Sequence, residues 1–247
     1  MSNYLLIHGA WGGAWEFDET IKGLEAHGHR AAAIDLPGHG KSKEPISEVT
    51  MKAYIARVLD ALNPIDGPVV LVGHSLAGAI VSQVAELAPD KIERLIFVAA
   101  MLPKTGDTPL GLMQSDSAGE LLPVLKFSDD ESYVTVGRSE VESLLLNDVN
   151  EPERMELFAP HFDMKQATEP FMYPAELSDQ AFGSVPKTYV RAALDKVLSP
   201  ALQDEMISNW KVDQVFTLES GHFPLMSMPE RLNEVLLEAA SVSAPRA

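Results

Sequence analysis

The sequence of 247 residues has no cysteine. This absence excludes disulfide bonds, thiolate metal sites and a cysteine nucleophile, and it leaves the redox compartment open. No apolar run approaches the ~18–20 residues that a transmembrane helix needs. The first residues also lack the basic and apolar segments of a signal peptide. We therefore expect a cytoplasmic protein.

Basic side chains are scarce. The 19 Lys and Arg residues stand against 36 Asp and Glu residues, which gives a net charge of −17. Phosphate backbones and anionic membrane surfaces repel such a chain, and it has no basic cluster that would offset this repulsion. We expect no nucleic-acid partner and no membrane partner. The acidity favours a neutral or small substrate, and it leaves a homodimer open.

Apolar residues make up 46% of the chain, an ordinary globular share that can bury a core. Apolar runs typical of buried strands alternate with helical patterns. The expected strands are 4–7, 30–34, 69–72, 94–98, 187–191 and 214–218, and the expected helices are 15–27, 50–62, 79–85 and one from about Pro229. This alternation predicts an α/β fold with a mostly parallel sheet flanked by helices.

The alternation breaks between about 101 and 185. This stretch is rich in Met, Leu, Phe, Pro and acidic residues, and it has no convincing strand. Ser139 and Glu142 have the spacing of a capping box, and Asn150 with Pro152 can begin a second helix. We expect a core of residues 1–100 and 186–247, with residues 101–185 inserted as a helical cap.

The stretch 73–78, Gly-His-Ser-Leu-Ala-Gly, lies between an apolar strand pattern and a helical pattern. A serine in a sharp turn between a strand and a helix is the layout of a nucleophile elbow. We therefore expect Ser75 to be a nucleophile. A serine hydroxyl needs a base within hydrogen-bond reach, and the base needs an orienting acid.

In this layout the acid and then the histidine follow the serine along the chain. His222 comes directly after the final strand, whereas His161 lies inside the insertion. Asp195 follows the preceding strand, Asp213 begins the last strand, and Glu219 shares its end with His222. Because active-site loops leave the carboxyl ends of parallel strands, we favour His222 as base and Asp195 as acid.

Two aimed donors are needed for the oxyanion of an acyl-transfer intermediate. We expect the backbone amides of Leu76, directly after the serine, and of Ala10, in the loop after the first strand. His8 is expected to hold this loop in shape, and Asp35 is expected to tie together the turn at 37–40. No metal cluster, phosphate loop or dinucleotide fingerprint is present in the sequence, so we expect neither a metal nor a cofactor.

Taken together, these segments resemble the α/β-hydrolase superfamily over nearly the full chain, and more narrowly the plant methylesterase and hydroxynitrile lyase group with its microbial esterase relatives. The resemblance implies Ser75, Asp195 and His222 as a catalytic triad, with the oxyanion hole at Ala10 and Leu76. The resembling segments are Leu-Ile-His-Gly-Ala-Trp-Gly-Gly-Ala-Trp at 6–15, Asp-Leu-Pro-Gly-His-Gly at 35–40, Val-Gly-His-Ser-Leu-Ala-Gly at 72–78 and Ser-Gly-His-Phe at 220–223.

The chain departs from this resemblance at three positions. The family elbow usually has glycine where this chain has Ala77. The lyase branch has a lysine after the catalytic histidine and a threonine in the first loop, where this chain has Phe223 and Gly9. Since a cyanide leaving group needs a nearby cation, ester hydrolysis is favoured over cyanohydrin cleavage.

We therefore expect a serine esterase that hydrolyses a small hydrophobic carboxylic ester, such as a methyl ester, an aryl ester or a lactone. The alternatives are a lyase on the same triad, a C–C hydrolase or thioesterase, and a ligand-binding receptor of this fold. Apolar side chains in the cap and around the triad are expected to line the pocket. These candidates are Trp11, Phe223, Phe127, Phe158 and Phe162.

Overall fold

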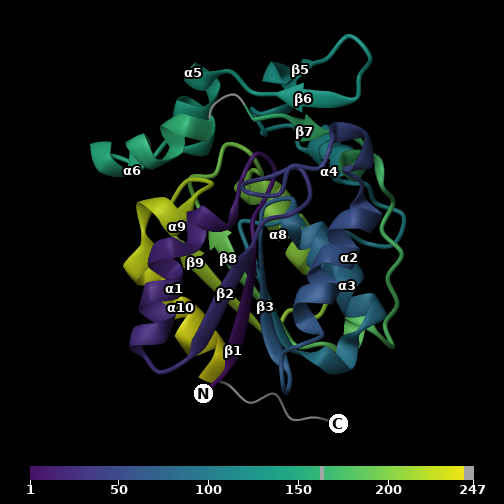
Figure 1. The fold of residues 1–247 in the computed structure, drawn as a ribbon, viewed down its shortest axis with the longest axis vertical. Coiled ribbons are helices and arrows are strands. Elements are labelled where there is room, and N and C mark those ends of the chain that lie inside the picture. The colour runs from purple at the N-terminus through teal and green to yellow at the C-terminus, as the bar shows by residue number, and fades with distance from the viewer. Residues whose placement is uncertain (162–163, 242–247) are drawn as a thin grey trace.

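One parallel sheet organises the molecule (Figure 1). The computed structural model describes residues 1–161 and 164–241, and within them six strands form this sheet in the order β2-β1-β3-β4-β8-β9. All neighbouring strands run parallel, which confirms the expected α/β architecture. The strands are β1 (Asn3–Ile7), β2 (Arg30–Ile34), β3 (Val69–His74), β4 (Ile92–Val98), β8 (Lys187–Ala192) and β9 (Gln214–Leu218).

The strand order changes direction at β1, which lies between β2 and β3. The pairing of Ile7 with Gly73 places the carboxyl ends of β1 and β3 side by side. Crevices that hold ligands in open α/β sheets form at such a switch point. The loops after β1 and β3 therefore meet at the position where this fold usually builds a site.

Helices cover both faces of the sheet (Figure 1). In this view α1 and α10 lie on one side, where they pack together, and α2 and α3 pack together on the other. The helices of the core are α1 (Asp18–Ala26), α2 (Met51–Leu62), α3 (Ala77–Leu87), α8 (Pro200–Ser208), α9 (Pro224–Ser227) and α10 (Pro229–Ser241). Short 3-10 turns lie at η1 (Ala14–Phe17), η2 (Ile46–Glu48) and η3 (Pro89–Lys91).

Local sequence explains where two of these helices begin. Thr50 caps α2 by accepting a hydrogen bond from the amide of Ala53 at 3.1 Å, and the apolar stripe of the helix is buried. The single helix expected at 15–27 is instead divided into η1 and α1. The amide of Glu16 donates to the carbonyl of Gly13, an i to i−3 bond that makes the first turn tighter than an α-helix.

Most of the segment between β4 and β8 lies over the carboxyl ends of the strands, and its last part, with η7, runs back beside α3 to the start of β8 (Figure 1). Its elements are α4 (Pro109–Ser115), η4 (Leu122–Val124), β5 (Lys126–Phe127), β6 (Tyr133–Thr135), α5 (Arg138–Glu140), a π-helical turn η5 (Val141–Leu145), α6 (Pro152–Phe158), η6 (Ala159–His161), β7 (Gln166–Ala167), α7 (Glu169–Met172) and η7 (Phe182–Ser184). We call this segment the cap.

The expectation of a cap without strands is wrong. The cap contains a small antiparallel sheet in the order β5-β6-β7, with Phe127 paired to Val134 and Val134 paired to Gln166. Strands of two or three residues are too short to show an alternating pattern in the sequence. They exist because distant segments pair with each other.

The predicted capping box is also wrong, because the helix begins at Arg138 after Gly137. The hydroxyl of Ser139 donates to the carboxylate of Glu140, 2.8 Å away, instead of capping the helix. The second predicted helix start is confirmed at Pro152, where α6 begins, although Glu151 and not Asn150 occupies the cap position. Proline suits a first helical position, where an amide proton would have no partner within the helix.

A buried polar cluster joins the cap to the core. Gln166 of β7 is fully buried; its amide group donates to the hydroxyl of Tyr54 at 3.1 Å, and its carbonyl accepts from Nε2 of His39 at 3.0 Å. At the other end of the cap, the Arg154 guanidinium donates to the carbonyls of Met226 and Ser227. These contacts attach two separated parts of the cap to the core.

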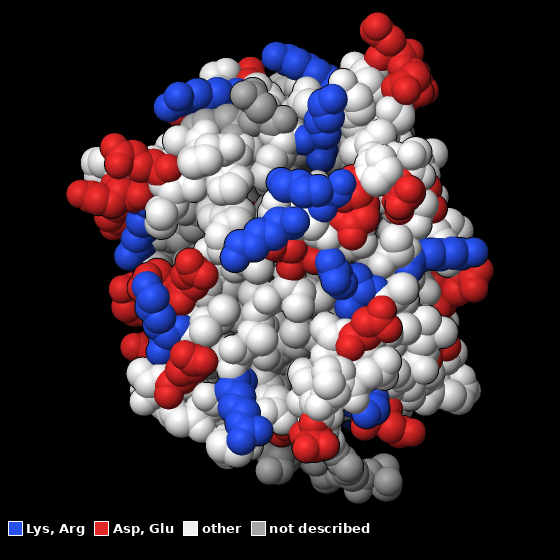
Figure 2. Space-filling view, in the orientation of Figure 1, with Lys and Arg blue, Asp and Glu red and all other residues white. Residues whose placement is uncertain are grey.

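On the face shown in Figure 2, acidic and basic side chains are interspersed, with several basic ones near the middle. A hollow of about 640 Å³ is lined by charged groups of both signs, three basic and three acidic: Lys41, Lys43, Arg57, Asp35, Glu44 and Asp60. No helix among the described residues has the length and apolar character needed to cross a bilayer.

Replacing Gln166 with leucine should destabilise the protein, because His39 and Tyr54 would each lose a buried partner. We expect the free energy of unfolding to fall by about 1–3 kcal/mol. Urea denaturation followed by circular dichroism measures this change. The matched control is Gln114→Leu on the exposed side of α4, which should change the free energy by less than about 0.5 kcal/mol. Equal effects of the two variants would contradict the argument.

Candidate active site

Ser75 occupies a sharp turn between β3 and α3. Its backbone has φ of 54°, in the left-handed region that residues other than glycine rarely adopt. The strand β4 and the residues after it hold this turn, since the amide of Ser75 donates to the carbonyl of Val98 and the amide of Met101 donates to the carbonyl of Ser75. The strained turn points the Ser75 side chain away from the sheet, towards the loops above it.

Two glycines make this turn sterically feasible. A Cβ on Gly78 would lie 2.1 Å from the carbonyl oxygen of Met101, and a Cβ on Gly73 would lie 3.0 Å from the backbone of Ala77. Ala77 itself is the first residue of α3, and it is buried with a negative φ. The alanine that departs from the usual glycine pattern is therefore accommodated in ordinary helical geometry.

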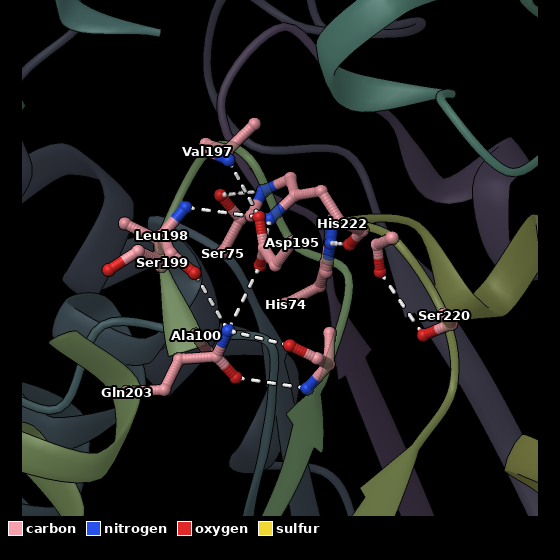
Figure 3. A network of polar contacts seen from close by, with 12 residues as sticks. His74, Ser75, Ala100, Asp195, Val197, Leu198, Ser199, Gln203, Ser220 and His222 are labelled. Carbon is pink, nitrogen blue, oxygen red and sulfur yellow. Dashed lines mark hydrogen bonds and ion pairs between the residues drawn. The ribbon is translucent and has the colours of Figure 1, made fainter. Parts of the chain in front are cut away.

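His222 lies between Ser75 and Asp195 in one chain of hydrogen bonds (Figure 3). Its Nε2 is 2.8 Å from Oγ of Ser75, and its Nδ1 is 2.8 Å from Oδ2 of Asp195. Asp195 and His222 are almost completely buried, whereas Ser75 is partly exposed. The structure thus brings together the three side chains that the sequence order selected. This arrangement can transfer a proton from the serine to the histidine while the carboxylate holds the imidazole.

The rival residues lie elsewhere. Asp213 lies at the start of β9, where its carboxylate accepts from the amide of Lys187 at 2.8 Å. His161 stacks on the indole of Trp15, with ring centroids 4.2 Å apart. These contacts give both residues structural partners away from the serine.

The carboxylate of Asp195 is held by its own loop. Its Oδ1 accepts from the amides of Val197 at 2.7 Å and Leu198 at 3.0 Å. Gln203 of α8 donates to Oδ2 at 3.3 Å, and it also donates to the carbonyl of Leu198 at 2.7 Å (Figure 3). Sequence reasoning missed Gln203. A glutamine on the apolar face of α8, next to Leu202, was the available signal.

His74 holds the backbone of the base. Its Nε2 donates to the carbonyl of His222 at 2.8 Å, and the two rings lie 5.0 Å apart. Burial, followed by the nearby His222 ring, lowers the pKa of His74 far below its ordinary value. His74 therefore stays neutral and positions the loop that carries His222.

The loop after β1 passes directly beside the serine. A Cβ on Gly9 would lie 2.7 Å from Cβ of Ser75, so only glycine fits there without a shift. Ala10 follows in this loop, and Leu76 follows Ser75; both are buried. The two residues expected to donate oxyanion amides thus come from the two loops that meet at the nucleophile.

His8 shapes this loop, in agreement with its expected role. Asp35 contacts the loop too, in addition to closing the expected turn at 37–40, where it accepts from the amide of Lys41 at 2.9 Å. Nε2 of His8 accepts from the amide of Leu36 at 3.0 Å, so Nδ1 carries the proton and donates to the carbonyl of Gly9 at 2.8 Å. The carboxylate of Asp35 accepts from the amide of Ala14 at 2.8 Å. The side chains of His8 and Asp35 therefore fix the backbone of the loop after β1 at its start, at Gly9, and at its end, at Ala14.

The expected pocket residues fall into two groups. Phe223 and Phe158 are buried and meet edge to face, with centroids 5.6 Å apart, and Trp11 is buried as well. Phe127 is 54% exposed on β5, so burial gives no support to its place in the pocket wall. Phe162 lies outside the described residues.

Within the described ranges, no group of three or more His, Asp or Glu could hold a metal ion.

Comparisons with known proteins find matches over nearly the whole chain. A model described as "Alpha/beta hydrolase family" matches residues 4–235. A pyrethroid hydrolase of Sphingobium wenxiniae is 31% identical over 253 residues, covering 99% of this chain and 89% of that protein. The crystal structure of a pyrethroid hydrolase from Sphingobium faniae JZ-2 matches with a TM-score of 0.85 at 31% identity, over 99% of this chain and 98% of that one.

Plant relatives match as well, and they confirm the resemblance seen in the motifs. A chloroplastic candidate methylesterase of Arabidopsis thaliana, number 11, is 30% identical over 254 residues, covering 98% of this chain and 65% of that protein. This chain spans 56–65% of the length of three such chloroplastic relatives. The relatives are named esterases and hydrolases.

Acid should destabilise the protein through His8. Burial, and next the neighbouring His39, lowers the pKa of His8 from 6.5 to about 3. Between these values the unfolded chain binds a proton that the native chain does not. The free energy of unfolding therefore falls as pH drops from 6.5 towards 3, by up to about 1.4 kcal/mol per pH unit for this group.

Urea denaturation at several pH values from 7 to 4 measures this slope. The variant His8→Asn should have a shallower slope than the wild type, because asparagine does not titrate. The control His27→Asn removes an exposed histidine and should keep the wild-type slope. A His8→Asn slope equal to that of the wild type would refute the assignment.

Proposed function

This chain belongs to the alpha/beta hydrolase family, and we propose that it is a serine esterase with Ser75 as nucleophile, His222 as base and Asp195 as orienting acid. One observation carries the proposal. Oγ of Ser75, Nε2 of His222, Nδ1 of His222 and Oδ2 of Asp195 are linked by two hydrogen bonds of 2.8 Å each. A pure binding protein has no need of this chain of contacts.

In the first half of the reaction, His222 accepts the proton of the Ser75 hydroxyl while Oγ attacks the ester carbonyl carbon. The carbonyl oxygen becomes an oxyanion, which the amides of Ala10 and Leu76 stabilise. When the tetrahedral intermediate collapses, the bond to the alcohol oxygen breaks. The proton on His222 passes to that oxygen, and the acyl group remains on Ser75.

In the second half, His222 accepts a proton from a water molecule, which attacks the acyl carbon. Collapse of the second intermediate returns the proton from His222 to Oγ of Ser75 and releases the carboxylic acid. Asp195 stays ionised and holds the imidazole throughout. The reaction needs no metal and no cofactor.

We also propose the substrate class, a small hydrophobic carboxylic ester. Support comes from two buried aromatic side chains, Phe223 beside His222 and Phe158 packed against Phe223, which favour an apolar acyl or alcohol group. Relatives named methylesterase and pyrethroid hydrolase point to the same class. The cap, proposed to span 101–185, would then select among such esters.

Two features disfavour cyanohydrin cleavage on the same triad. Phe223 places an apolar ring beside His222, with centroids 5.7 Å apart, where a cyanide leaving group needs a cation. Gly9 lies so close to Ser75 that a threonine there would force the loop to shift. Both positions support hydrolysis over lyase chemistry.

Replacing Ser75 with alanine should lower kcat/KM for short aryl esters by about 10⁴–10⁶, because the nucleophile is removed. A panel of methyl esters, aryl esters and lactones provides the measurement, and a fluorophosphonate probe should label the wild type but not the variant. The control Ser82→Ala changes a serine of α3 whose hydroxyl donates to the carbonyl of Gly78. An active Ser75→Ala enzyme would overturn the mechanism.

Incubation with mandelonitrile separates the esterase from the lyase. We expect ester hydrolysis and no release of benzaldehyde above the rate in buffer, because no cation is available at Phe223 for the departing cyanide. Absorbance of benzaldehyde measures the reaction. Rapid cyanide release without any esterase activity would show that the lyase alternative is correct.

A further inference from the structure

Trp11 connects the loop beside the nucleophile to the cap. Its indole Nε1 donates to the carbonyl of Val134 in β6 at 3.2 Å, and its side chain is buried. Its ring lies 6.1 Å from that of Phe171 in α7, also part of the cap. Because Trp11 directly follows Ala10, these cap contacts act on the residue next to a proposed oxyanion donor.

The backbone of Trp11 is strained. Its φ of 57° lies in the left-handed region, which is unfavourable for a bulky aromatic residue. Such a conformation persists only where the surroundings enforce it, and it is common at functional sites. The N–H of Ala10 belongs to the preceding peptide, between Gly9 and Ala10, whose carbonyl accepts from His8. Rotation about the N–Cα bond of Trp11 would displace Ala10 relative to the rest of the loop and so change the direction of that N–H.

The acceptor of the indole bond is itself fixed. β6 is the central strand of the small cap sheet, and Val134 pairs with Gln166 on the neighbouring strand β7. Gln166 is bound in the core by His39, whose ring lies 5.2 Å from that of His8. The carbonyl of Val134 is therefore held in position relative to the core that carries the nucleophile.

We infer that Trp11 is a positioning residue: its hydrogen bond to the cap sheet holds the loop in the strained conformation that aims the Ala10 amide at the oxyanion. Docking of the cap thus completes the oxyanion hole as well as covering the substrate. This inference rests on the proposed function and extends it. It assigns Trp11 a role in stabilising the transition state, beyond a place in the pocket wall.

The variant Trp11→Phe tests the inference, since it keeps an aromatic ring and removes the donor. Loss of one oxyanion donor costs about 10²–10³ in kcat in serine hydrolases. Trp11→Phe would displace the Ala10 amide without removing it, so we expect kcat to fall less, about 10- to 100-fold. KM should change less than about threefold. An aryl trifluoromethyl ketone, which forms an oxyanion on Ser75, should bind more weakly by the same factor as kcat falls.

Trp210→Phe is the matched control. The indole of Trp210 also donates to a backbone carbonyl, that of Pro103 at 2.9 Å, but this bond lies away from the loop beside Ser75. The control should keep the wild-type kcat and inhibitor affinity. If Trp11→Phe matches the wild type in kcat and in inhibitor affinity, or raises KM alone, the inference is wrong.

A second variant provides a test if Trp11→Phe does not fold. A second measurement tests the hydrogen bond without relying on catalysis. If Trp11→Phe does not fold, replacement of Trp11 by 3-benzothienylalanine preserves the ring shape and removes only the N–H, with the same expected kinetics. In ¹⁵N-tryptophan-labelled wild type, the Trp11 indole proton should exchange slowly with solvent. Fast exchange would overturn the inference, whereas a wild type inactive on every ester would overturn the proposed function instead.

Discussion

The site depends on one strained turn. At Ser75 the chain passes from a buried strand into a helix through a left-handed residue. The turn is tolerated because Gly73 and Gly78 leave room for the neighbouring backbone. Val98 at the end of β4 and Met101 shortly after it also form hydrogen bonds with the backbone of Ser75. Strain of this kind persists only when the surroundings determine it fully. The strands around β3 therefore have two roles: they form part of the packed core, and they hold the turn that exposes the Ser75 hydroxyl.

Around this turn the polar groups form a continuous buried network. Gln203 and the amides of Val197 and Leu198 hold Asp195, which in turn holds His222. Polar groups inside a protein are costly unless they are satisfied, and when satisfied they specify one arrangement. The network explains how a base on one loop meets a nucleophile on another without support from the substrate.

Buried hydrogen bonds also join the cap to the core. It reaches the core through Gln166 in a buried cluster and through Trp11 in the loop beside the serine. Both contacts join backbone or side chains far apart in the sequence. The proposed oxyanion loop therefore receives support from below, through His8 and Asp35, and from the cap above.

Much of the site could be predicted because the order of strands fixes the order of its residues. Apolar runs determined the six strands, and a parallel sheet brings their carboxyl ends to one edge, so Ser75, Asp195 and His222 were expected to meet. Motifs at 6–15 and 72–78 determined the family resemblance in the same way. These features are local in sequence, or they follow from topology alone.

Other features were decided only by tertiary structure. The cap strands are too short for a pattern, and they form because Phe127, Val134 and Gln166 pair across the cap. The predicted N-cap at Ser139 is wrong because the helix begins at Arg138, so that Ser139 already lies inside it. Gln203 and the indole contact of Trp11 serve the site through partners distant in the chain. The sequence by itself determined the elements and the reacting groups, and contacts between distant residues decided which side chains hold them in place.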